Sequence, residues 1–318
     1  MVSARVLLCL CCASFSSAAL AQQPDLSETQ IKSSALGGSL YLLNGAGGNM
    51  AALLGQDGVL LVDADFGALA QKITAQLRTL GATGGPRFLI DTHYHFDHTD
   101  GNAAFAAGGA TLIATGELRD RLATGNTIGN GGAIAREQPP SPAAALPLIT
   151  YESELTLHLD GEEVRVHHYP HAHTDGDSVV YFSAAKVVHM GDIYVRYGFP
   201  FIDTNGGGNV RGMIAACEDV LSHATEGTRI IPGHGEVATS ADLREYTQML
   251  KDTSALVQHA LEQGETLAQM QKEQLLGAFS ARYSPPKAFV DTAAFTESLY
   301  HSLAPLRPRH GPVRRPPR

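Results

Sequence analysis

Short apolar runs separated by turn-forming residues dominate the first part of the chain. Runs at 39–43, 50–54 and 59–62 are divided by Gly and Asn, which is typical of strands in an antiparallel meander. Residues 68–80 instead carry apolar side chains three and four positions apart, so they predict an amphipathic helix. Another apolar run at 88–90 predicts a strand that leads directly into a histidine-rich segment.

Strand-like and helix-like patterns continue after the histidine-rich segment. Residues 124–148 are rich in Gly, Pro and Ala and are predicted to form a long surface loop. Each half of the chain has several strands and then helices, which predicts an α/β fold with two sheets face to face and helices on both outer faces. We expect further strands at 111–114, 155–159, 163–167, 178–182, 186–189 and 229–231, and helices at 102–107, from Gly116 onward, and at 210–222, 241–262 and 289–303.

The two ends of the chain are predicted to lie outside this fold. Residues 1–21 combine Arg5, an apolar run and a small-residue site at 19–21, so they predict a secretory signal peptide cut near Ala21/Gln22 and a periplasmic or secreted protein. The apolar run is too short and too interrupted by Ser for a membrane anchor. Residues 22–37 are expected to form an irregular leader, residues 38–304 the folded domain, and residues 305–318 a basic, disordered tail.

Composition narrows the range of partners. The formal net charge is −9, and the body is more acidic than this because the tail holds Arg307, Arg309, Arg314, Arg315 and Arg318. An acidic body disfavours nucleic-acid binding, and we expect a small-molecule substrate and no stable membrane insertion; the oligomeric state stays open. Removal of the signal peptide leaves Cys217 as the single cysteine, which predicts no internal disulfide and a buried thiol on a helix.

The histidine-rich segment carries the strongest chemical signal in the sequence. His93, His95, Asp97 and His98 follow a predicted strand and precede a Gly-Asn turn. Because His93 and His95 are two positions apart, an extended backbone points both imidazoles the same way, while the residues on the turn can face a second point. Imidazole nitrogens and carboxylate oxygens are ligands that zinc favours. The segment therefore predicts a metal site.

Three further segments place ligand-type side chains at strand ends. They are 171–177, 189–192 and 231–235, and each lies in a Gly-containing loop where backbones can approach closely. Tyr94, which alternates with the ligands, is expected to point away from the metals or to border the groove. Among the remaining polar residues, we expect a structural role for His189, loop-forming and capping roles for Asp175 and Asp177, and either a site-lining or a surface position for His171.

Together these residues resemble the metallo-β-lactamase superfamily. Its five motifs occur in order over roughly residues 38–250, as Asp63, the 93–98 run, His173, Asp192 and His234. The resemblance implies a four-layer αββα sandwich of two mixed sheets that holds two Zn²⁺ ions. It also implies the ligand sets: one zinc held by His93, His95 and His173, the other by Asp97, His98 and His234, with Asp192 as the bridge. Asp63 matches an early superfamily Asp that supports the metal loop, and a turn-forming role at a strand end is its alternative.

The chemistry implied by this resemblance is hydrolysis by a hydroxide that the two zincs share. Asp97 would lie near this nucleophile and would orient it or shuttle a proton. The bridging position is Asp192, where the best-known β-lactamases carry Cys or Ser, whereas Asp is usual in the thioesterase, lactonase and phosphodiesterase branches. Arg196 either holds a substrate carboxylate or is a solvated loop residue, and the aromatic residues Tyr197 and Phe199 are predicted to form part of the substrate wall.

The sequence therefore predicts an exported di-zinc hydrolase. A β-lactam or a related cyclic amide is the leading substrate, because an exported protein with this resemblance most often meets such compounds. A lactonase, thioesterase or phosphodiesterase is the alternative enzyme. A non-catalytic zinc accessory protein is the alternative outside catalysis, and the full ligand set argues against it, because a purely structural zinc site closes with four ligands.

Overall fold

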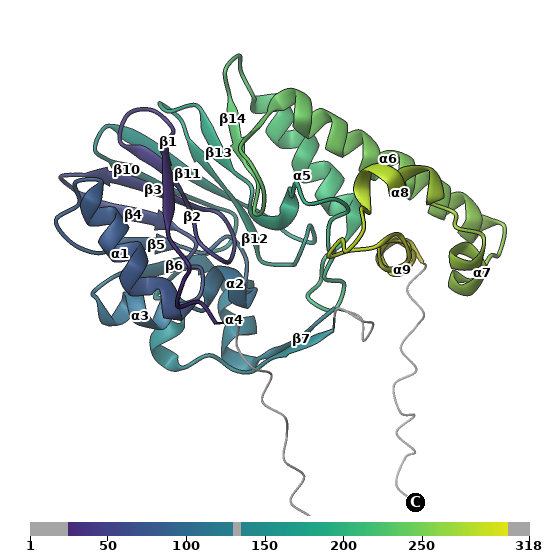
Figure 1. Ribbon diagram of the computed structural model, residues 1–318, viewed down its shortest axis with the longest axis horizontal. Coiled ribbons are helices and arrows are strands. Elements are labelled where there is room, and N and C mark those ends of the chain that lie inside the picture. The colour runs from purple at the N-terminus through teal and green to yellow at the C-terminus, as the bar shows by residue number, and fades with distance from the viewer. Residues whose placement is uncertain (1–24, 130–134, 305–318) are drawn as a thin grey trace, which may run out of the picture.

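Two β-sheets pack face to face in the structure, a computed structural model that describes residues 25–129 and 135–304. Helices cover the outer face of each sheet (Figure 1). The predicted α/β class and the αββα sandwich of two mixed sheets are confirmed. The predicted signal peptide at 1–21 and the predicted tail at 305–318 lie outside the described residues.

The first sheet is built from the N-terminal half of the chain. Its strand order is β1 (Lys32–Ala35), β2 (Leu40–Asn44), β3 (Met50–Gly55), β4 (Gly58–Val62), β5 (Phe88–Ile90), β6 (Thr111–Thr115) and β9 (Ile149–Tyr151). The strands from β1 to β4 are antiparallel, and β4, β5, β6 and β9 are parallel. In β4, Leu60 and Val62 face the second sheet, while Val59 and Leu61 face the helices. A strand that is apolar on both faces gives a continuous apolar run, which is why the sequence predicts it.

The leader predicted to be irregular contains a strand. Residues 32–35 form β1, which pairs antiparallel with β2 at the edge of the first sheet. Its sequence, Lys-Ser-Ser-Ala, is mostly exposed and has no apolar alternation, so the usual signal of a strand is absent. The prediction of an irregular leader is therefore wrong at these positions, because backbone pairing with β2 decides the conformation.

The second sheet is built from the C-terminal half. Its order is β10 (Glu154–Leu159), β11 (Glu162–Tyr169), β12 (Asp177–Phe182), β13 (Val187–His189), β14 (Arg229–Ile231) and β15 (Ala238–Thr239). β13 and β14 are parallel, and the other neighbours are antiparallel. Val164, Val166 and Val180 point toward the first sheet and join Leu60 and Ile90 in the core between the sheets.

Helices complete the outer layers. α1 (Ala70–Thr79), preceded by the 3-10 turn η1 (Gly67–Leu69), packs Ile73 and Leu77 against the first sheet. α5 (Val210–His223) and α6 (Ser240–Glu262) cover the second sheet, and the predicted buried thiol of Cys217 is confirmed there. The other α-helices are α2 (Phe96–Thr99), α3 (Asn102–Ala107), α4 (Gly116–Thr124), α7 (Leu267–Lys272), α8 (Gly277–Tyr283) and α9 (Thr292–Leu303). No helix among the described residues is both long and apolar enough to cross a membrane.

The segment predicted to be a long loop has structure of its own. It contains a hairpin of β7 (Asn126–Ile128) and β8 (Arg136–Gln138), followed by the 3-10 turn η2 (Ala143–Ala145). Gln138 Nε2 donates to the Tyr94 carbonyl over 2.8 Å, and the Arg136 guanidinium lies 3.8 Å from the centre of the Phe96 ring. The hairpin is therefore docked on the histidine-rich segment, which the high Gly, Pro and Ala content conceals.

Candidate metal centre

All the predicted metal ligands lie at one edge of the sandwich. β4 and β5 are parallel, so Asp63 after β4 and the 93–98 run after β5 leave the first sheet at the same edge. In the second sheet, Asp192 follows β13 and His234 follows the parallel β14. His173 precedes β12, which is antiparallel to β13, so it reaches the same edge. Donor atoms from both halves of the chain meet there in overlapping groups, within 4.8 Å of one another in each group.

The first cluster consists of His93, His95 and His173, all buried. His173 donates through Nδ1 to the Phe201 carbonyl at 2.8 Å, and His95 donates through Nε2 to the Asp203 carboxylate at 3.0 Å. These outer bonds place a proton on His173 Nδ1 and on His95 Nε2. The inner nitrogens, His173 Nε2 and His95 Nδ1, therefore present their lone pairs to each other at 3.0 Å. Two such lone pairs repel unless a cation lies between them.

His93 completes the first cluster with a third inward nitrogen. Its Nδ1 lies 3.1 Å from Thr92 Oγ1, and its Nε2 is buried without a hydrogen-bond partner among the described residues. Burial, followed by the neighbouring His98, holds the pKa of His93 well below its usual range. Burial, followed by His95, lowers the pKa of His173 to about 4. Both imidazoles are therefore neutral at pH 7, which is the form that binds metals.

The second cluster consists of Asp97, His98 and His234. His234 Nε2 lies 3.2 Å from Asp97 Oδ2 and 3.4 Å from His98 Nε2. Burial alone would raise the pKa of Asp97, but His98 and His234 outweigh it and lower the pKa to about 2. Burial also opposes a charge on His98, yet the carboxylates of Asp63, Asp192 and Asp97 raise its pKa. This concentration of negative charge attracts a positive one, and a metal cation would supply it.

Asp192 lies between the two clusters. Its Oδ1 is 3.4 Å from His98 Nε2 and 3.6 Å from His234 Nε2, and its Oδ2 is 3.9 Å from His173 Nε2. Burial opposes its ionisation, but His234 and His98 hold its pKa well below the usual range. A Cβ on Gly233 would lie 1.9 Å from Asp192 Oδ1, so only glycine allows the loop after β14 to approach so closely. The Asp192 carboxylate thus lies within 4 Å of imidazole nitrogens from both clusters.

Asp63 supports the 93–98 run from beneath. Its Oδ1 accepts from the Thr92 amide at 2.7 Å, and its Oδ2 lies 2.7 Å from His98 Nδ1. The second bond directs His98 Nε2 into the site. Asp63 itself has φ of 63°, a conformation that is uncommon outside glycine and persists where the surroundings enforce it. This placement agrees with the predicted supporting role.

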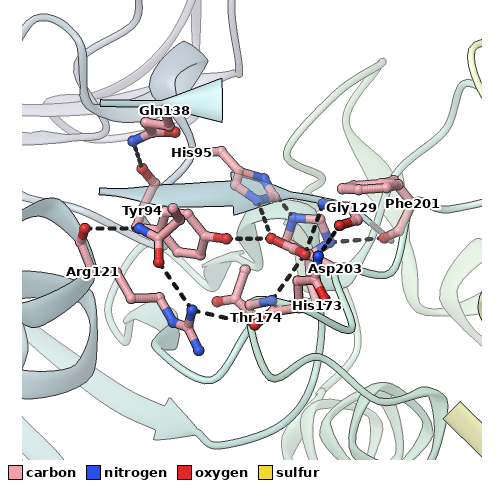
Figure 2. Close-up of polar contacts among 12 residues, drawn as sticks. Tyr94, His95, Arg121, Gly129, Gln138, His173, Thr174, Phe201 and Asp203 are labelled. Atoms are coloured by element: carbon pink, nitrogen blue, oxygen red, sulfur yellow. Dashed lines mark hydrogen bonds and ion pairs between the residues drawn. The ribbon is translucent and has the colours of Figure 1, made fainter. Parts of the chain in front are cut away.

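Asp203, a carboxylate that the sequence does not single out, orients a histidine of the first cluster as Asp63 orients His98. Figure 2 shows its fully buried side chain between Tyr94 and His95. Oδ2 accepts from the Tyr94 hydroxyl and from His95 Nε2, and Oδ1 accepts from the amides of Gly129 at 3.0 Å and Gly206 at 2.9 Å. Tyr94 thus points away from the metal-facing nitrogens, as predicted. No spacing in the sequence marks Asp203, because its partners come from distant segments.

The loop between β2 and β3 packs against the second cluster. This contact is not among those predicted from the sequence. Gly48 donates to the Asp97 carbonyl at 3.1 Å, and a Cβ on Gly48 would lie 2.1 Å from His98 Cε1. Asn49 donates through Nδ2 to the carbonyls of Pro232 and Gly235, both at 2.8 Å. The Gly-Ala-Gly-Gly sequence at 45–48 is the signal that could have indicated this close approach.

Two predicted substrate residues lie elsewhere. Arg196 directs its guanidinium to Asp242 Oδ1 at 3.5 Å and to the carbonyls of Glu236 and Val237, so it faces the start of α6 and not the metal clusters. Phe199 is fully buried and stacks between Phe295 and Tyr283, with ring centroids 4.4 and 5.5 Å away. For Arg196 the structure fits the second alternative, an exposed loop residue. The prediction that Phe199 forms part of the substrate wall is wrong, because packing with the C-terminal helices buries its ring.

The third predicted wall residue, Tyr197, is at the site. Its ring centroid lies 5.8 Å from that of His234. Two further aromatic residues join it: the Phe201 ring centroid lies 6.0 Å from that of His95 and 5.9 Å from that of His173, and the Phe289 centroid lies 5.7 Å from that of Tyr197. Of the other candidates, His171 is exposed, His189 is buried and donates through Nε2 to the Asn49 carbonyl, and Asp177 caps its loop through Thr174.

The donor set fits two zinc ions. Three imidazoles surround one point, and an imidazole pair with a carboxylate surrounds the other. Zinc takes nitrogen and carboxylate oxygen in this way, whereas Ca²⁺ and Mg²⁺ prefer oxygen alone. The inward lone pairs, the buried His93 Nε2 without a partner and the excess of carboxylates all point to cations at these two places.

Comparison with known proteins agrees with the fold. The family model described as the metallo-beta-lactamase superfamily matches residues 44–250. Among solved structures, the DIM-1 metallo-β-lactamase is similar with a TM-score of 0.56 at 17% sequence identity, covering 71% of this chain and 99% of its own. A metallo-β-lactamase from Pontibacter korlensis has a TM-score of 0.58 at 13% identity, covering 70% and 99%. No curated protein matches the sequence.

Proposed function

Because the chain belongs to the metallo-β-lactamase superfamily of hydrolases, we propose that it is an exported, two-zinc hydrolase whose leading substrate is a β-lactam or a related cyclic amide. The observation that carries the proposal is the pair of adjacent ligand clusters, with Asp192 within 4 Å of imidazoles in both. Bound zinc would supply Lewis acidity and a nucleophilic water at neutral pH.

The chain's own residues prepare the site for that chemistry. Asp97 is ionised at neutral pH, because its pKa lies at about 2. Its Oδ2 can accept a hydrogen bond from the attacking water and so orient it. His93, His95 and His173 present imidazole nitrogens toward one ion, and Asp97, His98 and His234 present donors toward the other. The supporting carboxylates Asp63 and Asp203 hold the imidazoles in these orientations.

A lactone or thioester is the second candidate substrate class. Asp192 favours it, because Asp at this position is usual in the lactonase and thioesterase branches of the superfamily. The two structural neighbours are named as metallo-β-lactamases, which supports the cyclic amide. A non-catalytic zinc protein is disfavoured, because seven candidate donors exceed the four that close a structural zinc site.

A side-by-side assay tests the proposal. The metal-free protein would be titrated with zinc and assayed against a chromogenic β-lactam, a lactone, a thioester and a phosphodiester. We expect activity to rise as the second equivalent binds and to be greatest on the β-lactam. Turnover of the phosphodiester alone would exclude a β-lactamase, and no turnover of any substrate with two zincs bound would exclude an enzyme of this type. Export is tested separately by the mass of the mature protein, which should begin at Gln22.

A further inference from the structure

Three aromatic rings form a contiguous cluster beside the metal centre. They belong to Tyr197 and Phe201, which follow Asp192 along the chain, and to Phe289, in the connection between α8 and α9. The Phe289 ring lies 5.7 Å from Tyr197 in an edge-to-face arrangement and 6.3 Å from Phe201. We call these three residues the aromatic wall.

The aromatic wall borders both metal clusters. Tyr197 lies 5.8 Å from His234 in the second cluster, and Phe201 lies about 6 Å from His95 and His173 in the first. Figure 2 shows the Phe201 ring next to these two histidines. A compound whose reacting bond lies between the clusters would therefore have the wall within reach of its neighbouring substituent.

Phe289 is the exposed part of the wall. It is 59% exposed, whereas Phe201 is 7% exposed and Val290, the next residue after Phe289, is 1% exposed. A single exposed phenylalanine carries little information. This one is in ring contact with two other aromatic side chains that border candidate metal ligands, so its free face is a place where a ligand would cover apolar surface.

The position of Phe289 is fixed by the C-terminal helices. Phe199 stacks between Phe295 of α9 and Tyr283 of α8, and its amide donates to the Tyr283 carbonyl at 2.8 Å. Residues 197–201, which carry two rings of the wall, are thereby held against residues 283–295, which carry the third. These helices lie beyond residue 250, where the match to the superfamily ends, so this part of the site belongs to the chain's own extension.

We propose that the aromatic wall selects substrates with a flat apolar group, aryl or cyclic, next to the hydrolysed carbonyl. The wall carries no charged side chain, so it suits an apolar substituent and not a carboxylate. The proposal rests on the hydrolase function proposed above and names the kind of acyl side chain that this site accepts. Phe289 is the specificity-determining residue, because its free face is the part of the wall open to a ligand.

Paired substrates test the role in turnover. Two β-lactams with the same ring system, one with a phenylacetyl and one with an acetyl side chain, would be compared on wild type, Phe289→Ala and a control, Leu256→Ala, whose side chain is an exposed apolar group on α6. We expect F289A to lower kcat/KM for the phenylacetyl compound on the order of tenfold, mainly through KM, with a much smaller loss for the acetyl compound. L256A should change neither. Equal losses on both compounds, or none, would overturn the proposal.

A binding measurement tests the wall independently of turnover. The chain contains no tryptophan, so Phe289→Trp introduces a single fluorescent reporter into the wall. We expect N-phenylacetylglycine to change its emission saturably and N-acetylglycine to leave it unchanged. No response to the phenylacetyl compound would refute the wall even if the enzyme hydrolyses β-lactams. A selective response without turnover of any substrate would retain the wall and reject the hydrolase function.

Discussion

Replacing Asp203 by asparagine tests how the first metal cluster is held. The carboxylate accepts four hydrogen bonds, from the Gly129 and Gly206 amides at Oδ1 and from Tyr94 and His95 at Oδ2. Asparagine has only one acceptor oxygen. If that oxygen stays with the two amides, the new NH₂ group faces His95 Nε2, which can accept only by moving its proton to Nδ1. Nδ1 is the nitrogen that faces the metal, so zinc affinity falls.

The size of the effect follows from these contacts. Loss of a partner that orients a ligand typically lowers metal affinity about 10- to 100-fold, or about 1.4–2.7 kcal/mol. If the asparagine oxygen instead turns toward His95, two buried amides lose their acceptor, at about 1–3 kcal/mol of folding stability each. Competition with a chromophoric chelator measures the affinity, and thermal unfolding of the metal-free protein measures the stability.

A matched control separates local damage from the effect on the cluster. Asp219 accepts from the Tyr169 hydroxyl at 2.5 Å, so Asp219→Asn alters another Tyr–Asp pair with no metal ligand attached. We expect this variant to bind two zincs like the wild type. The reasoning is refuted if D203N keeps both wild-type zinc affinity and wild-type stability of the metal-free protein.

Three further predictions follow from the described contacts. The pKa of His173 is lowered to about 4 from an ordinary value of 6.5. As the pH falls, His173 is therefore protonated in the unfolded chain before it is protonated in the folded protein. The metal-free protein should therefore lose up to about 3 kcal/mol of stability as the pH falls from 6.5 to 4; H173Q should remove this part of the dependence in thermal melts, and an unchanged dependence would contradict the assignment. Phe199→Ala should cost about 3–5 kcal/mol in urea unfolding, and a loss below 1 kcal/mol would show that the stacked rings do not bear on stability. Gly48→Ala places a Cβ 2.1 Å from His98 Cε1, so metal analysis should find the second zinc weakened and the first retained; equal retention of both would show that the loop yields.

The sequence predicts the buried strands and singles out the side chains that the structure gathers into the candidate clusters, for physical reasons. β5 is apolar and bounded by turn residues, so its pattern predicts a buried strand, and the strand is found at Phe88–Ile90 as predicted. The 93–98 run combines several ligand types at spacings that local geometry interprets directly. Such features depend on neighbours in sequence, which is the information that a single chain contains.

Other parts of the site depend on neighbours in space. Asp203 contacts His95 across 108 positions, and no local pattern distinguishes it from a surface loop carboxylate. Arg196 looks like a substrate ligand until α6 supplies Asp242 as its partner. Phe199 is predicted to line the substrate wall, but α9 buries its ring, whereas no pattern in the sequence marks Phe289, which is exposed.

The distribution of ligands between the two halves of the chain has a mechanical consequence. Each cluster joins residues of the 93–98 run to a residue of the second half, His173 in one case and His234 in the other. Each bound ion would act as a cross-link between the halves, and Cys217, the one cysteine among the described residues, has no disulfide partner there. Zinc would thus do for this protein what disulfides do in many exported ones. Loss of the ions should weaken the contact between the two halves at the edge that carries the ligands. The rate of amide hydrogen exchange in the ligand loops should therefore rise when zinc is withdrawn.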